Sequence, residues 1–204
     1  SLSDGLLRYY HTLAERMPVW LYHVPQNTKV DLPLPTVKAL ATQEGVVGLK
    51  DSSGDLGRFA FYQAEGLALR VYTGHAATFL GALALGAEGG ILVAANLAPR
   101  AYRALLLAFR EGRLSETQAL QKRLYPLGAL LAQGGVPLLK RALRHLGLPA
   151  GYPRLPYPAE SPLWPSFLPI LERLRRKDGY FKSGLAPPRP LSLALASKTL
   201  TRPP

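Results

Sequence analysis

Residues 45–50 read GVVGLK, and the small polar segment DSSGD follows at once at residues 51–55. The apolar run is typical of a short buried strand, and Lys50 closes that strand where the chain opens into a loop. Because burial disfavours the ammonium form of lysine, a lysine in this place can hold a neutral amine that attacks a carbonyl carbon. The alternative is a lysine that only marks the end of a strand and reaches into solvent.

This apolar run is one of several that recur along the first part of the chain. The others are also short, rich in Val, Ile, Leu and aromatic residues, and not alternating, as expected of parallel strands covered on both sides. Helical patterns separate them, which is typical of repeated strand–helix units. The predicted strands are residues 18–22, 46–50, 69–73 and 90–94, and the predicted helices are residues 4–16 (capped by Ser3 or Asp4), 34–42, 56–65 and 76–85.

After the fourth predicted strand, the chain is expected to be helical up to a tail. Residues 115–118 (SETQ) are typical of a helix start, and Pro126 is expected to kink or divide the helix that follows. From Ser183 onward, a composition rich in Pro, Ser, Leu and Ala predicts a disordered tail, although a frame-shifted end of the reading frame would look similar. The helices are predicted at residues 98–111, 115–131, 138–146 and 162–176, with a break at residues 134–137.

The strand–helix units define the expected fold. Four such units are half of an eight-unit barrel, which typically needs ~250 residues. The sequence therefore predicts an α/β fold, the second half of a (β/α)8 TIM barrel followed by C-terminal helices. We expect barrel units in residues 1–97, the last barrel helix and the helical region in residues 98–182, and the tail in residues 183–204. The chain is expected to be incomplete at its N-terminus.

The amino-acid composition argues against several classes of function and of site for this chain. The 204 residues include no Cys and four widely spaced His, so neither disulfides nor a metal site is expected. No apolar run is long enough to span a membrane and no signal-peptide pattern appears, which favours the cytoplasm. The net charge of +12 raises nucleic-acid binding as a hypothesis, but the basic residues are scattered and no nucleic-acid-binding motif accompanies them.

A series of short motifs adds a family resemblance over roughly residues 1–180. The chain resembles the dihydrodipicolinate synthase / N-acetylneuraminate lyase family, and the motifs occur in that family's order. The resemblance implies class I aldol chemistry on pyruvate, which needs no cofactor. The motifs are LYHVP at residues 21–25, VGLKDSSGD at 47–55, YTGH at 72–75, LGAEGGI at 85–91, AN at 95–96 and GVPLLK at 135–140.

The resemblance also implies roles for individual residues. Lys50 would form a Schiff base with the keto carbon of pyruvate, and Tyr22, at the end of the preceding strand, would relay a proton beside it. Gly74 and Ile91 would lie around the bound keto acid, because a glycine lets the backbone approach a ligand closely. Ser52 would contact the distal polar end of the substrate.

Plainer interpretations remain open for some of these positions. Gly74 and Ile91 could be ordinary turn and core residues, and Ser52 could cap the helix that begins near Leu56. His75 is interpreted as a loop histidine rather than a catalyst. Asn96 is expected to satisfy local backbone groups.

Asn27 narrows the activity that the resemblance implies. In the dihydrodipicolinate synthases, this position carries an arginine that binds the second substrate's carboxylate, and a neutral amide cannot replace that charge. We therefore expect a 4-hydroxy-2-oxoglutarate aldolase or related 2-keto acid aldolase, with dihydrodipicolinate synthase and a non-catalytic half-barrel remnant as alternatives. The expected partners are pyruvate, an aldehyde or 2-keto acid, and further copies of the chain, as in the family's tetramers; neither nucleic acid nor membrane is expected.

Overall fold

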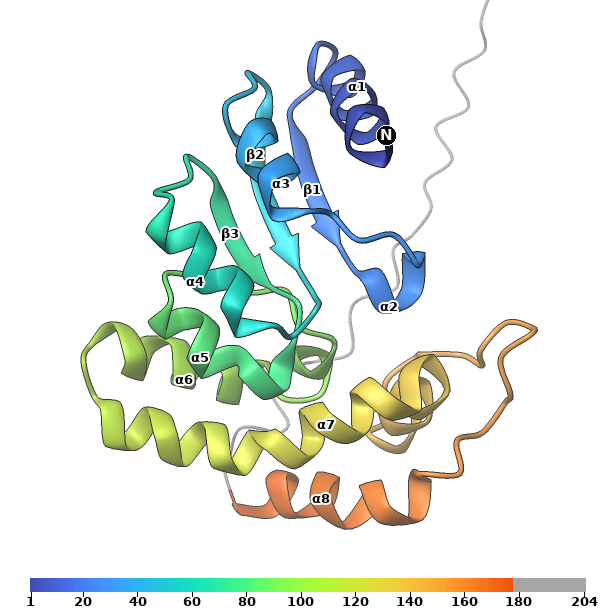
Figure 1. The fold of residues 1–204 in the computed structure, drawn as a ribbon. Coiled ribbons are helices and arrows are strands. Elements are labelled where there is room, and N and C mark those ends of the chain that lie inside the picture. Colours follow the sequence, from blue (N-terminus) through green and yellow to red (C-terminus); the bar gives the residue numbers. More distant parts are fainter. Residues whose placement is uncertain (178–204) are drawn as a thin grey trace, which may run out of the picture.

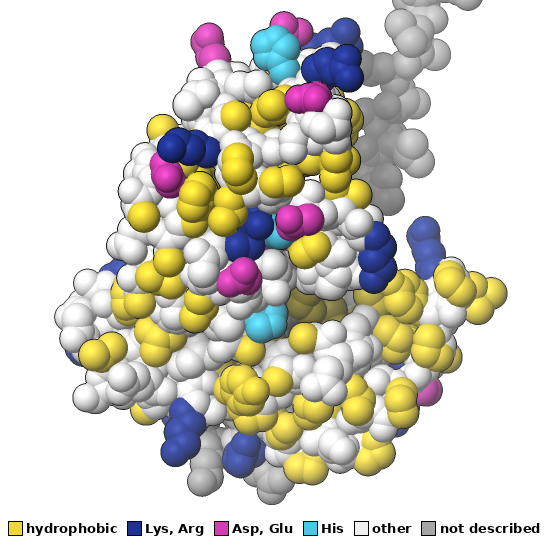
Figure 2. Space-filling model, viewed as in Figure 1, with side chains coloured by type: hydrophobic (Ala, Val, Ile, Leu, Met, Phe, Trp, Pro, Cys, Tyr) yellow, Lys and Arg dark blue, Asp and Glu magenta, His cyan; other side chains and the backbone are white. Residues whose placement is uncertain are grey.

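The computed structural model describes residues 1–177, and Figure 1 shows how their elements are arranged. The predicted tail from Ser183 lies outside these residues. None of the described helices is long and apolar enough to cross a membrane. On the face drawn in Figure 2, Lys and Arg side chains are interspersed with Asp and Glu, so the positive net charge does not form one basic patch there.

The strands form one parallel sheet in the order β1-β2-β3-β4. This arrangement confirms the predicted parallel α/β fold, and the first three strands agree with the predicted runs to within one residue at either end. Parallel pairing brings Tyr22 beside Lys50 and His23 beside Asp51 at the carboxyl ends of two neighbouring strands. The strands are β1 (Val19–His23), β2 (Val46–Asp51), β3 (Arg70–Thr73) and β4 (Gly89–Gly90).

The fourth strand is much shorter than predicted. Only Gly89 and Gly90 pair with β3, and the chain then turns into the 3-10 helix η2 (Val93–Asn96). Ile91 still donates its backbone N–H to the Thr73 carbonyl at 2.9 Å, but its side chain is about half exposed. A short apolar run has no periodicity that distinguishes a strand from a tight helical turn, which explains the error.

The helices beside the sheet follow the predicted order, except that one begins earlier and one additional turn is present. Helix α1 begins two residues earlier than expected, because Ser1 caps it and forms a reciprocal capping box with Asp4. A single unpredicted turn, α2, follows β1 and begins at Pro25, a residue whose fixed φ suits a first helical position. The helices are α1 (Leu2–Ala14), α2 (Pro25–Thr28), α3 (Leu34–Ala41), α4 (Leu56–Ala64), the 3-10 helix η1 (Ala76–Thr78) and α5 (Phe79–Ala84).

The C-terminal helices are α6 (Pro99–Arg110), α7 (Leu114–His145) and α8 (Trp164–Lys177). The helix is not divided at Pro126: the non-helical residue in α7 is Gly135, at φ 55° and ψ −148°, within the predicted break. Leu124 and Leu127 on either side of Pro126 are buried in the core, which holds the helix through the proline. The predicted cap at residues 115–118 is also wrong, because the Arg113 carbonyl already accepts hydrogen bonds from Thr117.

Two apolar clusters hold these elements together. One packs the sheet against α3 and α4 and includes Leu40, Leu49 and Phe59, and the other joins α6, α7 and α8 around Leu124 and Phe167. In Figure 1, α3, α4 and α5 lie along one face of the sheet, while the strand arrows point towards α7. The carboxyl ends of β1 and β2 therefore open towards α7, which places the ends of these strands beside a helix of the C-terminal region.

Candidate active site

Lys50 and Tyr22 lie side by side at the carboxyl ends of β2 and β1. They are partners in the strand register, and the Lys50 Nζ atom lies 4.1 Å from the centroid of the Tyr22 ring. Since partners in a parallel sheet point to the same face, both side chains project on the side opposite α3 and α4. An amine and a phenol are thus held together at the end of the sheet where barrel enzymes carry their chemistry.

The surroundings of Tyr22 favour release of its proton. Burial opposes ionisation of the phenol, but the Ser52 hydroxyl and the charged Lys50 amine stabilise the phenolate more strongly. The pKa of Tyr22 therefore lies below its ordinary value. A phenol of this kind gives up its proton at a lower pH than an isolated tyrosine does, which suits a group that relays protons.

A cavity of about 170 Å³ lies in front of this pair. All the site residues expected from the sequence line it: Tyr22, Asn27, Lys50, Ser52, Gly74 and Ile91. They come from strand ends and following turns that are far apart in the chain. The parallel sheet brings these segments to one edge, which is why a single cavity collects them.

Gly74 is placed where no side chain can fit. A Cβ atom on this residue would lie 1.8 Å from the Ser52 Oγ atom and 3.0 Å from the Lys50 Cε atom. The Gly74 backbone N–H also donates to the Asp51 carbonyl at 2.7 Å, which fixes the close approach of the two strand ends. The glycine therefore packs closely against the Ser52 and Lys50 side chains, which would have to shift to admit a methyl group.

Ser52 does not cap helix α4. Asp55 does so instead, accepting a hydrogen bond from the Gly57 backbone N–H at 2.7 Å. Ser52 is buried, and its side chain lies against Gly74 and near Tyr22. This placement leaves the Ser52 hydroxyl available to the cavity.

Several residues that line the cavity were not predicted from the sequence. His75, interpreted as a loop residue, lines the cavity with its Nδ1 atom 3.0 Å from the Thr78 hydroxyl, and burial lowers its pKa. Gln26 lies at the rim and donates to the Ser52 carbonyl at 2.9 Å. Helix α7 closes another side with Gly128, whose added Cβ would lie 2.8 Å from the Ala76 Cβ atom. A glycine inside a helical pattern was the one available signal of that close approach.

Asn96 behaves as expected and stays out of the cavity. Its side-chain amide donates to the Val93 carbonyl at 2.9 Å, so it satisfies a local backbone group of η2. Among residues 1–177, no group of three or more His, Asp or Glu side chains is arranged to hold a metal ion.

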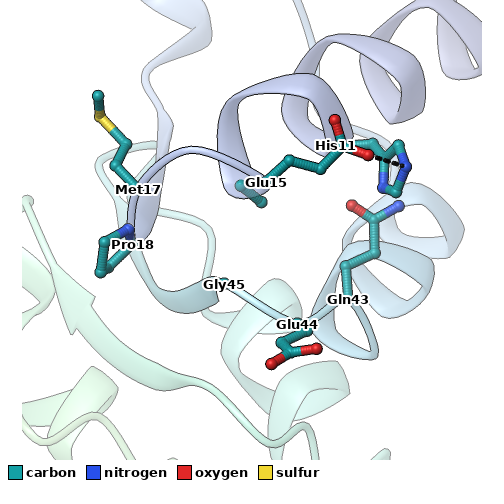
Figure 3. A pocket seen from close by; sticks show the side chains of 8 residues that line it. His11, Glu15, Met17, Pro18, Gln43, Glu44 and Gly45 are labelled. Atoms are coloured by element: carbon teal, nitrogen blue, oxygen red, sulfur yellow. Dashed lines mark ion pairs between the residues drawn. The ribbon is translucent and has the colours of Figure 1, made fainter.

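A second cavity, of about 640 Å³, lies at the opposite ends of the strands (Figure 3). Pro18 and Gly45, which line it, directly precede β1 and β2. Its polar side chains include His11 and Glu15, which form an ion pair of 3.2 Å with each other. This cavity is larger, but it holds no lysine and no tyrosine, and it is not the candidate active site.

The chain has a parallel sheet, helices that cover it and a lysine at the end of a strand. These features are those of (β/α)8-barrel proteins, and the chain corresponds to one part of such a barrel. Comparison with known proteins then identifies the family. The sequence profile of the dihydrodipicolinate synthetase family matches residues 2–162. The chain belongs to this family.

Individual relatives agree with this assignment. The chain is 36% identical over 163 residues to the 4-hydroxy-tetrahydrodipicolinate synthase of Hyphomonas neptunium, a match that covers 77% of this chain and 56% of the relative. The chain spans about half the length of the curated relatives that it matches.

Solved structures share the fold. A provisionally named dihydrodipicolinate synthase from Thermus thermophilus is 76% identical, with a TM-score of 0.84 over 86% of this chain and 62% of that one. The chloride-inhibited dihydrodipicolinate synthase of Acinetobacter baumannii, solved with pyruvate, is 30% identical, with a TM-score of 0.75 over 85% of this chain and 60% of that one.

Proposed function

We propose that the chain supplies the reacting residues of a Schiff-base-forming lyase that makes or breaks a carbon–carbon bond next to the keto carbon of pyruvate. The single observation that carries this proposal is the Lys50 amine, 4.1 Å from the Tyr22 ring centroid, facing a cavity at the carboxyl ends of the strands. The 30% identical Acinetobacter baumannii synthase, solved with pyruvate, supports the choice of keto acid.

The proposed chemistry begins once the Lys50 amine has given up a proton to Tyr22 or to water. The nitrogen lone pair attacks the keto carbon, the carbonyl oxygen takes up two protons and leaves as water, and an iminium remains on Lys50. The iminium withdraws electrons from the adjacent methyl carbon, which loses a proton to give an enamine. Tyr22 is the proposed relay, because its phenol lies beside the amine and has a lowered pKa.

In the synthetic direction, the enamine carbon attacks an aldehyde carbon and forms the new bond. Addition of water to the iminium then releases the product and restores the amine. In the cleavage direction, the same steps run in reverse and release pyruvate. Every proton moves between the Lys50 nitrogen, the substrate, Tyr22 and water, so the cycle needs no oxidant and no metal ion to balance.

The specific reaction that the comparisons support is that of a 4-hydroxy-tetrahydrodipicolinate synthase. The first four curated relatives carry this name, at 34–36% identity. They favour the synthase over the aldolase that Asn27 led us to expect from the sequence.

One observation keeps 4-hydroxy-2-oxoglutarate aldolase as a second candidate. The cavity rim carries the neutral amides of Asn27 and Gln26 on α2, where a guanidinium would bind a carboxylate in two places. A neutral rim lacks the charge that would bind the carboxylate of the synthase's second substrate, and this departure counts against the synthase.

A pair of assays on the full-length protein tests this choice. The first measures pyruvate release from 4-hydroxy-2-oxoglutarate, and the second measures formation of 4-hydroxy-tetrahydrodipicolinate from pyruvate and its aldehyde co-substrate. The proposal predicts a larger kcat/KM in the second assay. The opposite ranking would establish the aldolase, and no turnover in either would favour a non-catalytic remnant. Assembly into homo-oligomers stays a prediction, which sedimentation of the same protein tests.

A further inference from the structure

A buried polar cluster lies directly behind the candidate active site, on the opposite side of the same two strands. Asp51 follows Lys50, and His23 follows Tyr22, so alternation along the strands turns both side chains away from the cavity. Asp51 is fully buried and His23 is 2% exposed. The two residues are partners in the register, one position beyond the Lys50–Tyr22 pair.

Arg58 of α4 connects these two strand ends. Its Nε atom donates to Asp51 at 2.9 Å, and another guanidinium nitrogen donates to the Leu32 carbonyl at 2.8 Å. Its remaining nitrogen lies 3.7 Å from Asp31, which in turn lies 3.5 Å from the His23 ring. One guanidinium therefore joins β2, the segment between α2 and α3, and, through Asp31, the end of β1.

The cluster is closed around the Asp51 carboxylate. Tyr62 donates to it at 2.7 Å, and the Ser53 backbone N–H and hydroxyl donate at 2.9 and 2.6 Å. Burial alone would raise the pKa of Asp51, but these donors and Arg58 outweigh it and hold the pKa below its ordinary value. Asp51 stays ionised, so its position is fixed by charged hydrogen bonds that tolerate little displacement.

We propose that Arg58, which does not line the cavity, is a positioning residue that sets the spacing of Lys50 and Tyr22 by holding the ends of β1 and β2 together from behind. This role rests on the proposed function. Imine formation requires the amine, the phenol and the keto carbon to be aligned, and a misplacement of about 1 Å can cost roughly 100-fold in rate. A lysine at position 58 keeps the charge but loses the fork that bonds Asp51 and the Leu32 carbonyl at once.

The test is the rate of borohydride trapping of pyruvate on the full-length protein, measured against pyruvate concentration. For Arg58→Lys, we expect the rate constant at saturating pyruvate to fall about 10-fold or more, with little change in the pyruvate concentration that gives half the maximal rate. A merely structural role would lower the melting temperature and the trapped fraction but leave the rate constant of the folded molecules unchanged.

Arg144→Lys is the matched control. Arg144 of α7 also combines an ion pair, at 3.2 Å to Glu160, with a hydrogen bond to a backbone carbonyl, at 2.8 Å to Gly151, but it lies outside the candidate site. This variant should trap pyruvate at the unaltered rate. A slowing equal to that of Arg58→Lys would overturn the positioning role.

Two milder variants keep the proposal testable if Arg58→Lys does not fold. Asp31→Ala removes a residue whose side chain is 66% exposed, and Tyr62→Phe removes one donor to Asp51. Each should slow trapping several-fold. Trapping at the unaltered rate in every folded variant would contradict the positioning role alone, whereas no adduct in the unaltered protein would contradict both the proposed function and the role that rests on it.

Discussion

Each end of the sheet has a cavity, and the larger of the two is the one with fewer reactive groups. The cavity at the amino ends of the strands is about 640 Å³, and the one at the carboxyl ends is about 170 Å³. Only the smaller one brings an amine and a phenol together, because the strand register places Lys50 beside Tyr22 at that end. The candidate site is therefore identified by the convergence of reactive groups and not by the volume of the cavity.

Among variants at the smaller cavity, Lys50→Met is expected to lose the most activity. Loss of the amine removes the only group in the cavity proposed to form a covalent bond with the keto acid, so turnover should fall at least ~1000-fold. Lys38→Met is the matched control, because Lys38 is exposed on α3 and pairs with Glu65. Steady-state turnover of both variants checks the prediction, and retained activity in Lys50→Met would show that the smaller cavity is not the active site.

The next effect is expected from Tyr22→Phe. The ring stays beside Lys50 but the proton relay is lost, which should lower kcat about 100-fold or more. Tyr125→Phe, at an exposed tyrosine of α7, is the control and should leave kcat unchanged. A kcat for Tyr22→Phe within a factor of two of the unaltered protein would remove Tyr22 from the proposed mechanism.

The third-largest effect is expected from Gly74→Ala, which should lower kcat roughly 100-fold. The added methyl group would overlap the Ser52 hydroxyl and press on the Lys50 side chain, so the amine would be displaced from its position. Gly5→Ala in α1 is the matched control, since a Cβ there meets no atom within 4 Å, and it should stabilise the fold by about 0.5–1 kcal/mol. Kinetics and thermal melting of the two variants give the comparison; unchanged kinetics in Gly74→Ala would show that the packing is looser than described.

The smallest effect is expected from Ser52→Ala, on the pH dependence of the rate. The Ser52 hydroxyl lowers the pKa of Tyr22, so Ser52→Ala should raise that pKa towards its ordinary value. The alkaline limb of the rate profile that reports Tyr22 ionisation should therefore move to higher pH. Thr42→Ala, at a hydroxyl that bonds the Ala39 carbonyl near the amino ends of the strands, should leave the profile in place. A limb that moves to lower pH in Ser52→Ala would contradict the assignment.

Much of the fold could be predicted because the strands are short apolar runs. Residues 46–50 could be read as a strand from composition alone, and the parallel fold then placed Lys50 at the functional end of the sheet. Residues 91–94 could not, since nothing in an apolar run of that length separates a strand from a 3-10 turn. The division of the helix expected at Pro126 failed for a similar reason. The neighbours of Pro126 are buried, which keeps the helix intact, and burial is a tertiary property.

Some residues of the candidate site could likewise be predicted from the sequence, and others could not. Lys50 and Tyr22 could be predicted because each directly ends an apolar strand, and the family motifs surround both. His75 and Gln26 could not, because their place at the cavity depends on how separate turns meet in space. Arg58 is the clearest case, since its partners lie on β2 and on the segment between α2 and α3, and no local pattern joins them.

The most direct test of the central claim is to locate the pyruvate adduct. The full-length protein is incubated with pyruvate, reduced with borohydride, digested, and analysed by mass spectrometry. We predict that the reduced pyruvyl group is carried by the peptide that contains Lys50 and is absent from the Lys50→Met variant. An adduct on a different lysine, or none at all, would contradict the account.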